Sequence, residues 1–218
     1  EEPRLSAAPS VVAASGRPVT IRVRAAEAGD ADGLVAISRA VAAEPGQRLV
    51  ADATLRGASE ERRYIRAVRG SRDAALLVAE LDGELAGRLS IARDAHPASA
   101  HVADLGLMVA EPYRRRGVGT ALLLAAEAWA RAASIGKLEL HVFPDNDPAI
   151  ALYERCGFEQ EGRRARHYRL PDGTFAFASE LKALLQLSGL RRAVDDLKTQ
   201  IGAQQVQGYV LDLRRNPG

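Results

Sequence analysis

The chain has 218 residues, 47% of them hydrophobic and 27% charged, as in an ordinary globular protein with a sizeable core. Its net charge of +2 is too small for the protein surface as a whole to attract nucleic acid. The single cysteine, Cys156, excludes an intramolecular disulfide and a multi-cysteine zinc site, and we expect no metal. The longest apolar run, residues 121–126, is too short to span a bilayer, and the first residues lack the pattern of a signal peptide. We therefore expect a cytoplasmic protein without a membrane or nucleic-acid partner.

The first part of the chain predicts a leader, a strand and a helix. Residues 1–18 are rich in Ala, Ser and Pro without periodicity, which is typical of a flexible leader. Residues 20–24 alternate apolar and polar side chains as a strand does, and a helix follows that Asp30 or Asp32 can cap.

The middle of the chain predicts three strands and a long helix. Residues 74–79 and 85–91 read as strands joined by a hairpin turn at Asp82-Gly83. The apolar segment 102–109 predicts a third strand, and a helix is expected from about 118 to 133.

The next elements complete one domain. Residues 138–143 predict a strand, and Asp147 can cap a helix with Pro148 at its first position and Gly157 at its end. A further pair of strands begins at Phe158. The order β-α-β-β-β-α-β-α-β-β predicts a single α/β domain over residues 19–180, with a mixed central sheet flanked by helices.

The turn between strand 102–109 and helix 118–133 is the most informative segment. It holds three consecutive arginines and two glycines just before a helix start, where unpaired N–H groups and the helix dipole attract phosphate. Gly117 and Gly119 would let an anion approach the backbone without a Cβ in the way. The segment is neither a Walker A sequence nor a dinucleotide fingerprint. By itself it is also compatible with a tight turn before a core helix.

Two motifs together resemble a known family. Arg114-x-x-Gly117-x-Gly119 after an apolar strand is similar to the coenzyme-A signature of the GCN5-related N-acetyltransferase (GNAT) superfamily. The second signature of that superfamily resembles Asn146-x-x-Ala149-x-x-Leu152-Tyr153-x-x-x-Gly157-Phe158, which follows at the expected distance. The resemblance covers about residues 20–178. It implies the GNAT fold and an enzyme that transfers acetyl from acetyl-CoA to a primary amine by direct attack.

The resemblance also implies which residues hold acetyl-CoA. The thioester arm would lie along Leu107, Met108 and Val109, with the Val109 backbone on the acetyl carbonyl where the strand splays from its neighbour. Asn146 would contact the coenzyme further along. The phosphate-binding turn would comprise Arg114, Arg115, Arg116, Gly117, Val118, Gly119 and Thr120.

Tyr153 is the candidate general acid, because the resemblance places a tyrosine here that protonates the departing thiolate. The alternative is a purely structural role. Ala149, Leu152, Tyr153 and Cys156 follow the i, i+3, i+4, i+7 spacing of a buried helix stripe.

His141 is the candidate general base. The strand 138–143 places Glu139, His141 and Phe143 on one face. His141 lies five residues before Asn146, where the acetyltransferases of ribosomal-protein N-termini, the branch that this chain resembles, carry a catalytic glutamate. A neutral imidazole can accept a proton near neutral pH. The departure from glutamate leaves a structural hydrogen bond as the alternative.

Asp104 and Glu111 are the reserve candidates for the base. A covalent route through Cys156, at a helix end, is disfavoured.

The acceptor stays open between several amines. A peptide α-amine is slightly favoured, because residues 163–173 resemble the N-terminal acetyltransferase branch and an α-amine has a pKa of about 8 against about 10.4 for lysine. A small-molecule amine such as an antibiotic or polyamine is the alternative acceptor. Two alternative functions outside catalysis are a non-catalytic acyl-CoA sensor and a nucleic-acid-binding protein. The chain could form a homodimer.

Residues 181–218 form a C-terminal extension of unknown role. Residues 181–198 have helical apolar spacing. Residues 206–218 resemble a strand of carboxyl-terminal processing peptidases, but no catalytic serine segment follows in this sequence.

Overall fold

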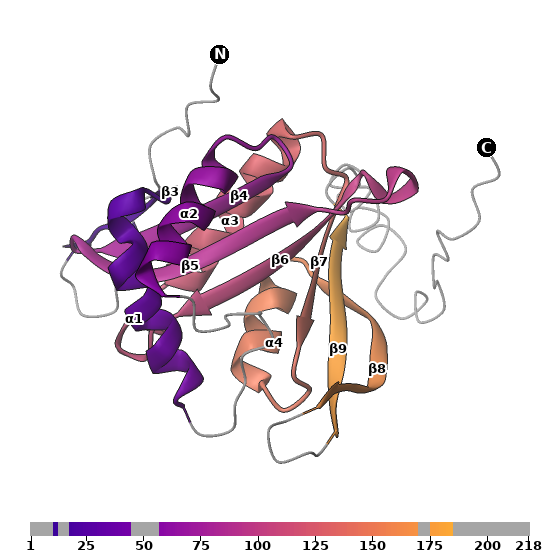
Figure 1. Cartoon of the computed structure of the whole chain (residues 1–218). Helices are drawn as coiled ribbons and strands as arrows, with labels where there is room; N and C mark the ends of the chain where they lie inside the picture. The colour runs from indigo at the N-terminus through magenta and orange to yellow at the C-terminus, as the bar shows by residue number, and fades with distance from the viewer. Residues whose placement is uncertain (1–10, 13–17, 45–56, 170–174, 185–218) are drawn as a thin grey trace, which may run out of the picture. The chain divides into compact units, whose positions relative to one another are not determined.

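A computed structural model describes residues 11–12, 18–44, 57–169 and 175–184 (Figure 1). The predictions for a leader over residues 1–18, for the turn at 171–173 and for the chain beyond Leu184 lie wholly or mainly outside the described residues.

A seven-stranded mixed sheet forms the centre of the fold, as predicted, with β6 and β7 parallel and every other neighbouring pair antiparallel. In spatial order the strands are β3 (Ile21–Ala25), β4 (Ala74–Leu81), β5 (Glu84–Arg93), β6 (Val102–Val109), β7 (Lys137–Val142), β9 (Phe175–Leu184) and β8 (Glu159–Arg169). A separate two-stranded pair joins β1 (Val11–Val12) and β2 (Pro18–Val19).

Helices cover both faces of the sheet. In the described residues the α-helices are α1 (Ala31–Ala42), α2 (Ala58–Arg69), α3 (Val118–Ala132) and α4 (Asp147–Arg155). The short 3-10 turns of the same residues are η1 (Ala28–Asp30), η2 (Pro97–Ser99) and η3 (Glu111–Tyr113). Helices α1 and α2 pack on one face and α3 on the other (Figure 1). Strand β4 is buried on both sides. Leu76 and Val78 face α1 and α2, while Leu77 and Ala79 belong to a second cluster of buried side chains, packed on α3 and here called the α3 cluster.

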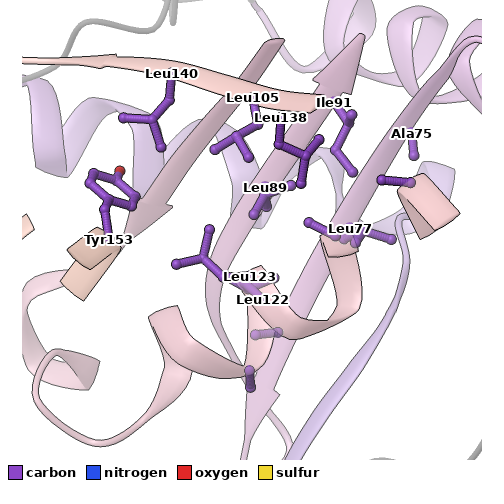
Figure 2. Close-up of a cluster of buried hydrophobic side chains, with 14 of the residues drawn as sticks. Ala75, Leu77, Leu89, Ile91, Leu105, Leu122, Leu123, Leu138, Leu140 and Tyr153 are labelled. Atoms are coloured by element: carbon purple, nitrogen blue, oxygen red, sulfur yellow. The ribbon is translucent and has the colours of Figure 1, made fainter. Parts of the chain in front are cut away.

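The α3 cluster is the main core, and it reaches from β3 across the sheet to β7 and α4. Figure 2 shows Tyr153 of α4 at one edge of this cluster, near Leu140 of β7. The core therefore carries α4 against the same sheet face as α3.

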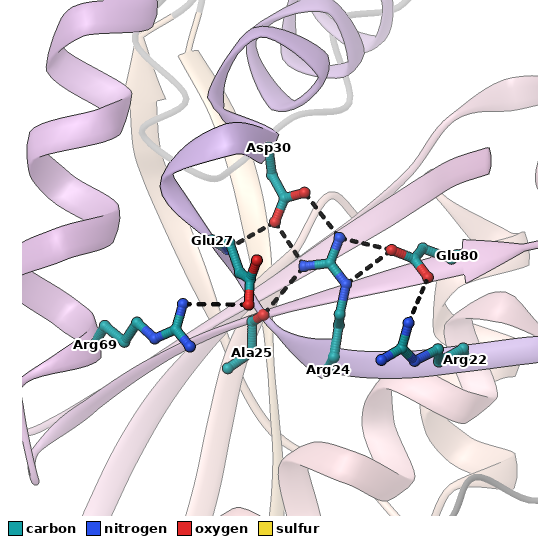
Figure 3. Close-up of polar contacts among 7 residues, drawn as sticks. All are labelled: Arg22, Arg24, Ala25, Glu27, Asp30, Arg69 and Glu80. Atoms are coloured by element: carbon teal, nitrogen blue, oxygen red, sulfur yellow. Dashed lines mark hydrogen bonds and ion pairs between the residues drawn. The ribbon is translucent and has the colours of Figure 1, made fainter. Parts of the chain in front are cut away.

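An ion-pair network fixes the start of α1 (Figure 3). The Arg24 guanidinium of β3 donates to both carboxylate oxygens of Asp30, at 2.7 and 2.8 Å, and its Nε donates to Glu80 of β4 at 2.8 Å. Asp30 also accepts a hydrogen bond from the Glu27 N–H at 2.7 Å. The hydrogen bond from Arg24 holds the pKa of Asp30 below its usual value. These contacts bind the first turn before α1 to the edge of the sheet.

Strands β6 and β7 separate partway along their length. Their parallel ladder holds only three pairs: Val102↔Lys137, Ala103↔Leu138 and Asp104↔Glu139. Beyond these pairs β6 continues to Val109 and β7 to Val142. In Figure 1 the two strands spread toward their C-terminal ends, and α4 lies between those ends in this view. The splay expected at Val109 is therefore present in the sheet.

The structure corrects the prediction of a helix from residue 181. Residues 181–184 continue strand β9, where Leu181 pairs with Leu140 and Leu184 with Lys137. Short apolar runs fit either a helix or a strand, and pairing with β7 decides the conformation here. The predicted domain boundary at residue 180 consequently cuts through β9.

Candidate active site

The turn after β6 ends in an open helix start. Gly117 is the N-cap of α3 with a φ of 87°, and Arg115 before it has a φ of 60°. No side chain caps α3, and the first helical donor is Ala121, whose N–H bonds the Gly117 carbonyl. The N–H groups of residues 118–120 precede that donor and point out of the helix end. This end can bind a phosphate group.

The three arginines of the turn have different surroundings. Arg114 donates to Glu44 and to the Val109 carbonyl, and an Arg116 nitrogen lies 3.8 Å from an Asp82 carboxylate oxygen. The exposed Arg115 forms no ion pair with a carboxylate of the described residues. Of the three, Arg115 is the side chain most available to an anion.

Gly119 faces helix α4. A Cβ at this position would lie 2.7 Å from the Leu152 Cδ2 atom and 3.8 Å from the Leu107 Cδ2 atom. The absence of a side chain therefore lets α3 and α4 pack closely. This differs from the expected reason for Gly119, which was room for an anion.

Val109 presents its peptide groups to the gap between β6 and β7. The N–H of the next residue, Ala110, donates to the Ala86 carbonyl of β5 at 3.0 Å. Peptide groups of successive strand residues point to opposite sides, so the N–H and C=O of Val109 point away from β5. That side is where β7 has separated.

The thioester-arm residues divide between the two sheet faces. Leu107 and Val109 pack on the α3 cluster, whereas Met108 packs with Ile37 and Ala110 on the α1 side. The three residues predicted to line one arm therefore offer side chains to both faces and share only the strand backbone.

The two candidate proton carriers also lie on opposite faces. Tyr153 belongs to the α3 cluster together with Leu140 of β7. His141 alternates with these buried leucines and is half-buried on the other face, as predicted, with its Nε2 atom buried.

Tyr153 is a buried phenol. Its side chain is 6% exposed and its ring centre lies 5.7 Å from that of Phe158. Burial raises the pKa of Tyr153 above its usual value, and the neighbouring Cys156 adds to the shift. The hydroxyl is therefore protonated throughout the neutral range.

Asp104 lies where the β6–β7 ladder ends, paired with Glu139. Partial burial and the charge of Glu139 together raise the pKa of Asp104 to about 6, against the lowering effects of a hydrogen bond from the Leu105 N–H and the charge of Arg164. Its side chain still contacts solvent. By strand alternation Asp104, Glu139 and His141 share one sheet face. The two candidate bases, Asp104 and His141, therefore lie on the same face of the sheet.

The remaining candidates are placed as follows. Asn146, not Asp147, is the N-cap of α4, and its side chain makes no capping bond. Glu111 is exposed in η3. Cys156 is half-buried at the end of α4, where burial raises the pKa of its thiol. A thiol held protonated is a poor nucleophile.

Comparison with known proteins identifies the family. The profile of the Acetyltransferase (GNAT) family matches residues 47–158, about half of the chain. The L-amino acid N-acetyltransferase AaaT of Escherichia coli K12 is 39% identical over 106 residues, which cover 47% of this chain and 63% of AaaT.

Solved structures agree with that assignment. A GNAT-family acetyltransferase from Streptococcus pneumoniae superposes with a TM-score of 0.68 at 30% identity, covering 76% of this chain and 99% of that one. YncA of Salmonella typhimurium, solved with acetyl-CoA, has a TM-score of 0.67 at 17% identity over 76% of this chain and 94% of its own, a likeness of fold. The chain belongs to the acetyltransferase (GNAT) family, whose enzymes are acetyl-CoA-dependent N-acetyltransferases.

Proposed function

We propose that the protein transfers acetyl from acetyl-CoA to the α-amine of an amino acid or of a peptide N-terminus. The observation that carries this proposal is the gap between β6 and β7. Strand β6 leads into the turn before the open start of α3, and β7 carries Leu140 on the face of Tyr153 and His141 on the opposite face.

The turn before α3 binds the pyrophosphate of acetyl-CoA. The N–H groups of residues 118–120 and the Arg115 guanidinium supply donors and positive charge there. Asn146, whose side chain does not cap α4, contacts the coenzyme further along. The Val109 N–H, which faces the gap, donates to the acetyl carbonyl and stabilises the negative charge that develops on its oxygen.

Two residues handle the protons. His141 accepts a proton from the attacking amine on its face of the sheet, and Asp104 is the alternative base because its pKa of about 6 suits the same task. As the amine nitrogen bonds to the acetyl carbon, the carbon–sulfur bond breaks and Tyr153 donates its proton to the departing thiolate. The Tyr153 hydroxyl is protonated at neutral pH and so carries the proton that the thiolate needs, although the burial that raises its pKa makes it a weaker acid.

An α-amine is favoured as the acceptor for two reasons. The E. coli relative is named an L-amino acid N-acetyltransferase. An α-amine has a pKa of about 8, whereas the lysine side-chain amine has a pKa of about 10.4. The α-amine therefore loses its proton to His141 or Asp104 more easily. A small-molecule amine such as a polyamine or an antibiotic is the second candidate.

The test is coenzyme-thiol release from acetyl-CoA with a matched panel of acceptors. The panel holds free L-amino acids, short peptides with free N-termini, the same peptides N-terminally blocked but containing lysine, and polyamines. We expect kcat/KM to be highest for a free α-amine, and the first two groups distinguish amino acids from peptides. Turnover only with blocked lysine peptides or polyamines contradicts the acceptor. Acetyl-CoA binding without any turnover indicates a sensor instead.

A further inference from the structure

Arg114 belongs to the phosphate-binding motif, but each of its three guanidinium nitrogens already donates one hydrogen bond within the protein. Its two terminal nitrogens donate to the two carboxylate oxygens of Glu44 at 2.9 and 2.6 Å. Its Nε donates to the Val109 carbonyl at 2.9 Å. A bidentate hydrogen bond between an arginine and a carboxylate is one of the strong polar contacts in proteins. A phosphate would have to displace Glu44 to recruit these donors.

The Val109 carbonyl, which accepts the hydrogen bond from Arg114, lies at the end of β6. It points to the side from which β7 has separated, so the sheet provides no strand to bond it there. The Arg114 Nε supplies that hydrogen bond in place of a neighbouring strand. The contact restrains the end of β6, where the Val109 N–H also faces the gap.

Glu44 brings a distant helix to the same point. It lies two residues beyond the end of α1, whose side chain Ile37 packs with Met108 and Ala110 at the end of β6. Glu44 and Arg114 are 70 residues apart in the sequence. The contact therefore ties the end of α1 to the strand that borders the gap.

We propose that Arg114 is a positioning residue for acetyl transfer rather than a ligand of the coenzyme phosphates. Together, Arg114, Glu44 and the Val109 carbonyl form what we name the Arg114 clamp. The clamp holds the Val109 peptide groups and the end of α1 in the arrangement that the reaction needs. This inference rests on the proposed function, in which the Val109 N–H contacts the acetyl carbonyl.

The test is a double-mutant cycle of Arg114→Gln and Glu44→Gln. Because both substitutions break the same clamp, we expect each to lower kcat/KM for the acceptor by about tenfold to a hundredfold, and the double variant to be little worse than the poorer single one. The Kd for acetyl-CoA should stay within about threefold of the parent value, since Glu44 already neutralises Arg114.

A phosphate ligand would behave differently. Arg114→Gln would then weaken acetyl-CoA binding by more than about tenfold, while Glu44→Gln would leave it unchanged or tighter. Either that result or additive effects in the cycle overturn the clamp. Arg114→Lys gives a second comparison. Lysine keeps the positive charge, but its single ammonium group cannot make the bidentate bond to Glu44 and the bond to the Val109 carbonyl at the same time. The clamp predicts that Arg114→Lys resembles Arg114→Gln, and parental kinetics in Arg114→Lys contradict it.

A matched control pair lies on α3. Arg131 and Glu127 form an exposed ion pair at 2.6 Å, one helical turn apart. A Glu127→Gln/Arg131→Gln cycle should leave acceptor kinetics unchanged. A readout without turnover comes from melting temperatures of the same variants, where the clamp predicts coupling between residues 44 and 114. If the parent turns over no amine, the proposed function fails, while the melting cycle and the coenzyme Kd still test the clamp.

Discussion

At the scale of single residues, Tyr153 is both a core side chain and the proposed acid. Its position in the buried stripe of α4 agrees with a structural role, and its membership of the cluster that reaches β7 agrees with a role at the gap. The burial that packs the ring also raises the pKa of the hydroxyl. Burial is therefore compatible both with packing and with a protonated hydroxyl, so neither burial nor the pKa alone separates the two roles.

Replacing Tyr153 by Phe separates the two roles, because it removes the hydroxyl and keeps the ring. If the hydroxyl protonates the thiolate, kcat should fall by about a hundredfold or more. The Kd for acetyl-CoA should change little, since a thioester sulfur accepts hydrogen bonds weakly. Melting temperature, coenzyme Kd and turnover are measured on one variant. Turnover within a few-fold of the parent's would limit Tyr153 to packing.

The pKa of Asp104 makes a prediction about stability. Because folding raises this pKa from 3.8 to about 6, the folded state binds the proton more tightly, and the associated stability is present below about pH 4 and lost as the pH rises through 6. Asp104→Asn should therefore stabilise the fold at pH 8, by under about 1 kcal/mol because the carboxylate keeps solvent contact. The gain should vanish near pH 4. Thermal unfolding across this range checks the sign, and a gain independent of pH would be inconsistent with it.

The same variant distinguishes the two candidate bases. If Asp104 accepts the amine proton, Asp104→Asn lowers kcat/KM and removes the part of its acidic-side decline that comes from protonation of the base. If His141 accepts the proton, that part persists in Asp104→Asn and is lost in His141→Ala, which leaves the coenzyme Kd nearly unchanged. Profiles of kcat/KM against pH for the two variants decide. A parental profile in His141→Ala would return His141 to a structural role.

At the scale of elements, the contact between α3 and α4 depends on Gly119. A Cβ would lie 2.7 Å from the tip of Leu152, a flexible side chain that can move only into space that the cluster leaves. The second signature of the family therefore contributes packing as well as Tyr153, since Leu152 holds α4 against the start of α3.

Gly119→Val should cost about 1–3 kcal/mol of folding free energy through overpacking. Adding Leu152→Ala should recover part of that loss, because it removes the atoms that the new side chain meets. Urea unfolding of the single and double variants, with Leu152→Ala alone as control, measures the recovery. A fully stable Gly119→Val protein with weakened acetyl-CoA binding would instead support the anion-contact role expected from the sequence.

Local patterns predicted local structure well. The alternation in β7, the hairpin at Asp82-Gly83 and the strand–turn–helix around Gly117 each depend on neighbours in the sequence, and each agrees with the structure. Helix α2 was missed, although its buried residues Glu61, Ile65 and Val68 follow helical spacing. Glu61 interrupts the apolar pattern by which a buried helix face is recognised in a sequence. Its burial is accompanied by an ion pair with Arg88, which lies in a distant strand and cannot be read from the helix sequence.

Contacts between distant segments account for the other differences. Residues 181–184 were expected in a helix, and their pairing with β7 could not be read from their own sequence. The engagement of Arg114 by Glu44 likewise joins positions 70 residues apart. The motif identified Arg114 as part of the site, but only the folded chain shows which partner occupies its guanidinium.

At the scale of the whole molecule, every described element that borders the gap precedes residue 185. In the described part of the chain no helix is long and apolar enough to cross a membrane, and no three metal-binding side chains gather. The first of the two units into which the chain divides ends at Leu185. Strand β9 belongs to that unit and lies between β7 and β8.

A chain ending at Leu185 should therefore keep its melting temperature within a few degrees, its acetyl-CoA Kd and its turnover. A chain ending at residue 174 should not fold, because losing β9 removes the backbone partners of β7 and β8 together. Circular dichroism, thermal unfolding and coenzyme titration compare both with the full chain. If the chain ending at Leu185 is folded but binds acetyl-CoA weakly or turns over slowly, residues 186–218 contribute to the site. If the chain ending at residue 174 unfolds cooperatively with parental coenzyme affinity, β9 is dispensable and the gap needs only β6, β7 and the helices beside them.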